Sequence, residues 1–218
     1  MYIPDLSQAF VEGRKVKHGQ GEAVMTIKPV GTLVMPTGRI VACDPLVSPE
    51  YEPFTLGVAP GRYPVLLSVA QLGTDQRVAY AMLRFAERDA ARWEMALIPG
   101  QDVSQLAADH FFGYPVDAGT GCFIDAEAAR VLLERLKDEE YSERLIEEMD
   151  KNYVPTWSWL DECLDAATGA NLIAFSSGWG DGAYASYFGY DEDGKVVNLI
   201  TDFGVLFEDD NVEGSKSV

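Results

Sequence analysis

Histidine and cysteine are scarce in this chain of 218 residues, which has two histidines and three cysteines. The cysteines, Cys43, Cys122 and Cys163, are far apart and odd in number, which argues against a disulfide framework and against a paired-cysteine metal site. No zinc-binding spacing of cysteine and histidine is present. We therefore expect reduced thiols and a cytoplasmic protein.

Basic residues are also few, because 17 Lys and Arg stand against 35 Asp and Glu, for a net charge of −18. Such a field repels phosphate backbones and anionic lipids, so we expect no nucleic-acid partner and no membrane partner. The sequence contains neither an apolar run of roughly 18 residues nor the start of a signal peptide. Two interpretations of the charge remain: solubility, or an acidic face that binds a basic protein partner by electrostatic steering.

The chain is rich in short β-branched and aromatic runs, separated by turn signals such as Lys28-Pro29 and Pro36-Thr37-Gly38. The runs cover residues 24–27, 32–34, 39–43, 63–69, 77–85, 92–97, 171–175, 183–190 and 195–200. This pattern is typical of antiparallel sheets and sandwiches. With 47% apolar residues, the length fits one domain. We predict a single globular α+β domain over residues 1–218, mainly an antiparallel β-sheet or sandwich, with a flexible tail at about 208–218.

A helical segment at about residues 125–166 is expected to be inserted between the strands. Asp125 is a suitable N-cap for a helix that extends to residue 136 with apolar side chains on one face. Residues 139–149 predict a second helix with an acidic face, and residues 157–164 a third. A further short helix is expected at residues 5–12.

The most distinctive motif is Gly178-Trp179-Gly180-Asp181-Gly182, which is followed by Tyr184. Glycine serves turns that need a positive φ or a close approach of the backbone. Three glycines around one carboxylate favour a built site, with Trp179, Asp181 and Tyr184 as binding residues. In the alternative interpretation the aromatic rings belong to the core. Downstream, the turn Asp191-Glu192-Asp193-Gly194 predicts a hairpin over residues 183–200 that pairs with strands from the first half of the chain.

Four aspartates lie at strand ends or turns: Asp44, Asp117, Asp181 and Asp202. If these turns converge, the carboxylates could bind Mg²⁺ or Ca²⁺ through oxygen ligands, or support acid–base chemistry. The alternative is that each aspartate bonds the N–H groups of its own turn.

Residues 117–121 also superficially resemble the phosphate loop of sugar kinases and actin-like ATPases, and Thr120 lies within them. Backbone N–H groups in such a loop can bind phosphate. That fold, however, needs two such loops in a much longer chain.

Nucleophilic catalysis has little support in the sequence. His18 and His110 are the only histidines, and neither belongs to a known catalytic motif. Cys122 is more typical of a small buried residue than of a reactive thiol, although a pair of Cys122 with His110 stays open.

Residues 38–45, 117–121 and 177–184, followed by Asp202-Phe203, occur in the order found in one family of proteins. In this combination, from about Gly31 to Leu206, the chain resembles domain-of-unknown-function family 4241. The resemblance implies a bacterial, cytoplasmic, single-domain protein and transfers no catalytic residue, because the family has no established activity. Where relatives often carry proline after the tyrosine, this chain has Ala185.

We therefore predict a non-enzymatic, acidic protein-binding domain of the immunity or antitoxin type. The expected acidic patch consists of Glu139, Glu140, Glu143, Glu147, Glu148, Asp150, Glu208, Asp209 and Asp210. The alternative is a metal-assisted hydrolase of a small phosphorylated or nucleotide substrate, which would use Asp44, Asp117, Asp181 and Asp202. Convergence of these four carboxylates on one cleft would favour the enzyme.

Overall fold

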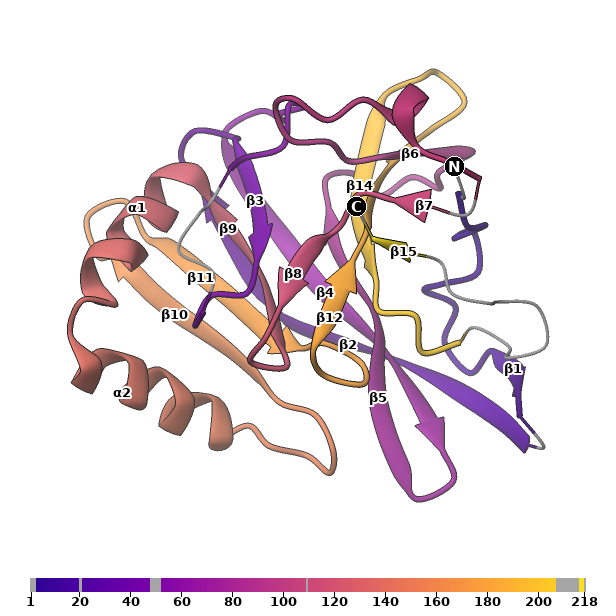
Figure 1. Cartoon of the computed structure of the whole chain (residues 1–218), viewed down its shortest axis with the longest axis horizontal. Helices are drawn as coiled ribbons and strands as arrows, with labels where there is room; N and C mark the ends of the chain where they lie inside the picture. The colour runs from indigo at the N-terminus through magenta and orange to yellow at the C-terminus, as the bar shows by residue number, and fades with distance from the viewer. Residues whose placement is uncertain (1–2, 20, 48–51, 109, 207–215, 218) are drawn as a thin grey trace.

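The computed structural model describes residues 3–19, 21–47, 52–108, 110–206 and 216–217. Its largest element is a curled antiparallel sheet of seven strands (Figure 1). In spatial order the strands are β1 (Lys15–His18), β2 (Gly21–Met35), β4 (Gly61–Leu72), β5 (Asp75–Arg84), β14 (Val196–Asp202), β13 (Ser186–Tyr190) and β6 (Arg92–Met95). The strands β13 and β14 therefore join the N-terminal strands in one continuous sheet.

A second antiparallel sheet packs against the first. Its strands, in spatial order, are β10 (Trp159–Asp165), β11 (Ala170–Ser176), β9 (Thr120–Asp125) and β3 (Ile40–Cys43). Phe123 and Phe175 of this sheet share one buried cluster with Met25 and Leu83 of the seven-stranded sheet. Because alternate residues of a strand point to opposite faces, the other face of the small sheet is left for a third layer.

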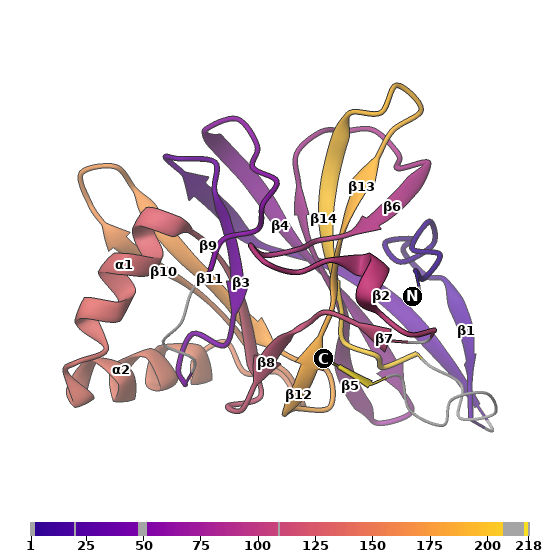
Figure 2. The ribbon, with the colours of Figure 1, turned by 45° about the horizontal axis from the view of Figure 1, so that its top comes forward.

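Two helices form that third layer: α1 (Ala126–Arg135) and α2 (Glu139–Asp150) (Figure 2). Leu132 and Leu145 of the helices pack on Ile124 and Leu172 of the small sheet in a separate buried cluster. No helix in the described parts of the chain is both long and apolar enough to span a membrane.

Shorter elements fill the space between the sheets and along their edges. The strand β12 (Gly182–Tyr184) pairs with β8 (Tyr114–Val116), and β7 (His110–Phe111) pairs in parallel with β15 (Lys216–Ser217). A 3₁₀ turn, η1, covers Val103–Gln105. On the outer face of the seven-stranded sheet, Leu6 and Ala9 pack on Met82 and Ile200.

The predicted α+β class with mainly antiparallel sheets is confirmed. The helix from Asp125 and the acidic helix after it are present, with Asp125 and Asp138 as their N-caps. The predicted hairpin is also present, since β13 pairs with β14, β14 pairs with β5 and β13 pairs with β6.

The predicted helix at residues 157–164 is wrong, because this segment contributes the strand β10. Leu160 and Leu164 are both buried, and a spacing of four suits one face of a helix as well as one face of a strand. Pairing with the buried strand β11 decides between the two. The predicted helix at residues 5–12 is also wrong: residues 7–10 form a turn in which Ala9 N–H donates to Leu6 O at 3.0 Å.

Two strand boundaries differ from the prediction. Lys28-Pro29 is no turn, since β2 continues through it with an irregularity between Pro29 and Gly31, where proline is tolerated. The expected strand 183–190 is two strands, β12 and β13, which belong to different sheets and are separated by Ala185. Most of the tail predicted to be flexible, including Glu208, Asp209 and Asp210, lies outside the described residues.

Candidate functional site

Two turns singled out in the sequence, residues 117–121 and 177–182, lie side by side. Strand pairing forces this arrangement, because β9 and β11 place Thr120 opposite Ser176, and β8 and β12 place Val116 opposite Gly182. We call these two segments the paired turns. They join the small sheet to the edge of the β8–β12 ladder.

Two carboxylates hold the first of the paired turns by accepting hydrogen bonds from its backbone. Asp181 accepts a hydrogen bond from Gly119 N–H at 3.0 Å. Asp44, which is fully buried, accepts from Asp117 N–H at 2.9 Å and from Ala118 N–H at 2.7 Å. Three of the four predicted aspartates therefore meet at one loop, but they meet through backbone N–H groups.

The second turn is fixed by hydroxyl groups and by close packing. Tyr184 donates its hydroxyl hydrogen to Gly180 O at 2.7 Å, and Ser177 donates its own to the same oxygen at 2.8 Å. Gly178 has φ +58°, and a Cβ there would lie 2.9 Å from the Phe203 side chain. The glycine is therefore required both by its backbone conformation and by the close approach of the core.

This rigid turn presents Trp179 to solvent, with 53% of the residue exposed. The guanidinium carbon of Arg77 lies 5.0 Å from the centre of the indole ring, and the His18 ring stacks beside it at 6.5 Å. Trp179, Asp117 and Asp181 are thus the exposed members of the predicted binding set, whereas Tyr184 is buried against Phe203. An exposed tryptophan on a fixed turn is suited to a contact with another molecule.

The paired turns do not form an anion site. The N–H groups of Asp117, Ala118 and Gly119, which a phosphate would need, already donate to Asp44 and Asp181. The Thr120 hydroxyl is buried and donates to Ala118 O at 3.1 Å. The phosphate-loop interpretation is therefore not supported by this geometry.

A metal-binding interpretation finds no ligand set. In the part of the chain that the structure describes, no group of three or more His, Cys, Asp or Glu side chains is arranged to hold a metal ion. Asp44 also accepts from Leu46 and Val47, and Asp202 accepts from Gly204 N–H at 2.8 Å. Because these carboxylates bond backbone N–H groups, they act as turn-forming residues, and the Mg²⁺ or Ca²⁺ site expected of the hydrolase does not form from them.

Asp202 nevertheless has an unusual environment at the end of β14. Burial away from water raises the pKa of this carboxyl to about 6, and the hydrogen bond from Gly204 offsets only part of the effect. The carboxyl is therefore charged at neutral pH at a cost in stability.

The pair of Cys122 with His110, which the sequence left open, receives no support. His110 Nδ1 lies 3.1 Å from Ala108 O, and the sulfur of buried Cys122 lies 3.5 Å from the sulfur of Cys43. Sequence reasoning missed this thiol pair. Its signal was limited to Cys43 at the end of the predicted strand 39–43, because the strand β9 that carries Cys122 was not predicted and strand register cannot be deduced from local sequence.

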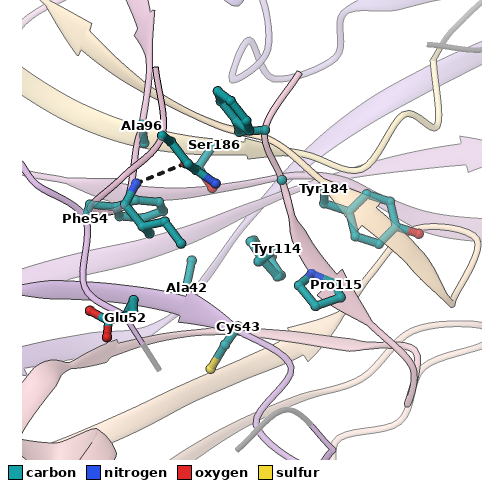
Figure 3. A pocket seen from close by; sticks show the side chains of 13 residues that line it. Ala42, Cys43, Glu52, Phe54, Ala96, Tyr114, Pro115, Tyr184 and Ser186 are labelled. Carbon is teal, nitrogen blue, oxygen red and sulfur yellow. Dashed lines mark hydrogen bonds between the residues drawn. The ribbon is translucent and has the colours of Figure 1, made fainter. Parts of the chain in front are cut away.

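A cavity of about 400 Å³ was also missed. It lies between the edge strand β3 and the segments around Ala96 and Tyr114, with Phe54 and Ser186 on its walls (Figure 3). Its size is within the range of small-ligand sites. Its lining comes from five separate parts of the chain, so no local motif could have predicted it.

Comparison with known proteins gives one match. Residues 33–201 match the model of the family described as "Protein of unknown function (DUF4241)". The chain belongs to this family. The matched region of DUF4241 contains the paired turns and Trp179 and ends one residue before Asp202. No curated protein matches, and no solved structure matches. Membership in DUF4241 confirms the predicted resemblance and leaves the activity uncharacterised.

Proposed function

We propose that this DUF4241 protein is a non-enzymatic binding protein of the immunity or antitoxin type, which acts in the cytoplasm. It binds a basic protein partner through the outward face of α2. The observation that carries the proposal is the combination of acidic and apolar side chains exposed on this helix.

The acidic component is concentrated. Between Asp138 and Asp150 the chain has seven acidic residues and one basic residue, Arg144. Arg144 donates to Glu162 at 2.8 Å, so its charge is already paired. Of the predicted acidic patch, Glu139, Glu140, Glu143, Glu147 and Asp150 are exposed, whereas Glu148 is partly buried and pairs with Lys151.

The apolar component lies on and just beyond the same helix. Ile146 is 49% exposed between Glu143 and Glu147, and Tyr153 is 55% exposed one turn after the helix ends. Ile146 and Tyr153 provide apolar area that strengthens the affinity of a contact beyond what charges alone would give. The carboxylates speed association and select a basic partner. Solubility alone does not require exposed apolar residues within an acidic face.

The experiment is affinity capture from an extract of the native host at low and at high salt. The baits are the wild-type protein, a Glu143→Lys/Glu147→Lys variant, and a control in which Asp89→Lys and Glu192→Lys change the charge equally outside α2. Asp89 and Glu192 are exposed, so the control tests net charge without touching the helix.

We expect wild type and control to capture the same basic protein at low salt and to release it at high salt. The α2 variant should lose at least about tenfold in affinity for that protein. An immunity role further requires that the captured protein inhibits growth when expressed alone and that co-expression of the wild-type chain restores growth. Equal capture by the α2 variant, or no salt-sensitive partner, would reject the proposal.

A further inference from the structure

Cys43 and Cys122 face each other on neighbouring strands. They are register partners in the β3–β9 pair, although 79 residues separate them in the sequence. Their sulfur atoms are 3.5 Å apart, and both side chains are buried. The third cysteine, Cys163, is exposed on β10.

The backbone geometry suits a covalent link. Directly opposite residues of an antiparallel pair have Cα atoms about 4.5–5.5 Å apart, and disulfides occur at Cα separations of about 4.4–6.8 Å. Joining the two sulfurs therefore requires rotation of side chains and no change of strand register. The two cysteines are thus reduced thiols whose sulfur atoms are already in contact.

We propose that Cys43 and Cys122 form an oxidation site, at which a small hydroperoxide converts the two thiols into one disulfide. This inference is independent of the proposed protein-binding function, since it concerns two cysteines buried between the small sheet and the helices, not the outward face of α2, and needs no partner protein.

The reaction has two steps. The Cys43 thiolate attacks one oxygen of the hydroperoxide, an S–O bond forms, the O–O bond breaks, and the departing oxygen takes up a proton as water or an alcohol. The Cys122 sulfur then attacks the resulting sulfenic acid, an S–S bond forms, and the hydroxyl leaves as water with the thiol proton. Two thiols lose two electrons, and one hydroperoxide gains them.

The position of Cys43 makes it the first residue to react. It is the less buried of the two and ends β3, an edge strand of only four residues, which can open more easily than the central strand β9. Cys43 is one of the residues that line the cavity, and in Figure 3 its sulfur lies on the other side of β3 from the Ala42 side chain. Burial raises the pKa of the Cys43 thiol, so the thiolate is scarce and the reaction is slow compared with that of an exposed thiolate.

The disulfide would also reinforce the paired turns. Cys43 is followed directly by Asp44, whose carboxylate holds residues 117 and 118, and these residues lead into β9 and Cys122. A disulfide between Cys43 and Cys122 would therefore add a covalent link beside the hydrogen bonds from residues 117 and 118 to Asp44. We therefore expect the oxidised protein to melt at a higher temperature than the reduced protein.

The experiment uses the full chain with Cys163→Ser, so that only the pair remains. The folded, reduced protein is treated with hydrogen peroxide, then unfolded and alkylated. We expect both thiols to disappear, the mass to fall by that of two hydrogen atoms, and dithiothreitol to restore both thiols and the lower melting temperature. Parallel samples carry Cys43→Ser or Cys122→Ser in addition and should show no loss of hydrogen mass.

Oxidation in urea separates folded geometry from simple thiol chemistry. The thiols react with peroxide more slowly in the folded protein, but we expect a larger share of the oxidised thiol to end as the intramolecular disulfide there than in the unfolded chain, because only the fold keeps the two sulfurs 3.5 Å apart. If both thiols of the folded protein stay alkylatable, if they gain oxygen without forming a disulfide, or if the disulfide forms only in urea, the proposal is wrong. Should a serine variant fail to fold, peptide mapping of the oxidised Cys163→Ser protein still shows whether Cys43 is joined to Cys122.

Discussion

Aspartate carboxylates in this protein serve mainly as acceptors for backbone N–H groups. Asp44 accepts from four of them, Asp125 caps α1 while also bonding Thr37, and Asp181 ties one glycine turn to another. A carboxylate that accepts several N–H bonds fixes the conformation of a loop, because hydrogen bonds to a charged acceptor are short and directional. An apolar side chain cannot make such bonds. The Asp-Gly motifs that suggested catalysis are therefore explained at the residue scale by loop construction.

Asp202 gives a prediction about pH. Its folded-state pKa of about 6 lies above the ordinary value of 3.8, so the folded protein binds the proton more tightly than the unfolded chain. The stability that Asp202 contributes is fully present below about pH 4 and is lost as the pH rises through about 6. Asp202→Asn should remove this loss and stabilise the protein at pH 7 by up to about 3 kcal/mol.

Urea unfolding of both proteins from pH 4 to pH 7 is the measurement. Asp191→Asn is the control of opposite sign, because the Lys195 N–H and Arg88 lower the pKa of Asp191. Its contribution is present above the unfolded pKa and is lost as the pH falls through the folded one. If the difference in free energy of unfolding between wild type and Asp202→Asn is the same at pH 4 and at pH 7, the raised pKa of Asp202 is contradicted.

The two helices differ in how firmly their first turns are attached to the rest of the fold. Asp125, the N-cap of α1, is fully buried and accepts hydrogen bonds from Glu127 N–H and from Thr37 N–H, both at 3.0 Å. Asp138, the N-cap of α2, is exposed, and within the described parts of the chain its carboxylate accepts one hydrogen bond, from Glu140 N–H at 3.1 Å. The N-cap of α1 therefore also links the helix to Thr37, which is 88 residues away in the sequence, whereas the N-cap of α2 bonds the Glu140 N–H of its own first turn.

At the element scale we predict unequal costs for removing the two caps. Asp125→Ala should lower the free energy of unfolding by roughly 2–4 kcal/mol, since it removes a cap and leaves the Thr37 N–H without a partner. Asp138→Ala should cost only about 1 kcal/mol, the usual value of a cap. Denaturant titration of both variants gives the comparison, and equal losses would show that the buried bonds from Thr37 add nothing.

At the scale of the whole molecule, the fold places helices, a small sheet and a large curled sheet in successive layers, with two buried apolar clusters between them. The polar periphery has to carry a net charge of −18. Like charges over such a surface oppose the compact state. Burial of the apolar clusters therefore has to outweigh the electrostatic repulsion between the acidic residues at the surface.

Salt should consequently stabilise the protein. Raising NaCl from about 10 mM to about 0.5 M shortens the screening length from roughly 30 Å to a few ångströms and should raise the melting temperature. MgCl₂ or CaCl₂ at the same ionic strength should raise it no further, because the predicted ligands Asp44, Asp181 and Asp202 already accept backbone N–H groups. An additional shift at low millimolar divalent ion would indicate specific binding to the folded state and would reopen the metal site.

Local chemistry alone was enough to predict the helix after Asp125, the acidic helix after it, the Asp-Gly hairpin and most of the strands. Each of these depends on neighbours within a few residues: a cap, a spacing of three or four, a turn with a positive φ. The glycine turn around Trp179 was recognised for the same reason. The α+β class followed because such segments leave few ways to bury their apolar faces.

Only the tertiary structure decided which of these segments meet. Leu160 and Leu164 fit a helix or a strand until β11 pairs beside them, and Tyr184 and Tyr190 read as one strand until the chain changes sheets at Ala185. The contact of Asp181 with Gly119 and that of Cys43 with Cys122 depend on strand register over 62 and 79 residues. Register is set by burial of whole sheet faces, a property of the assembled core, so no stretch of sequence taken by itself contains it.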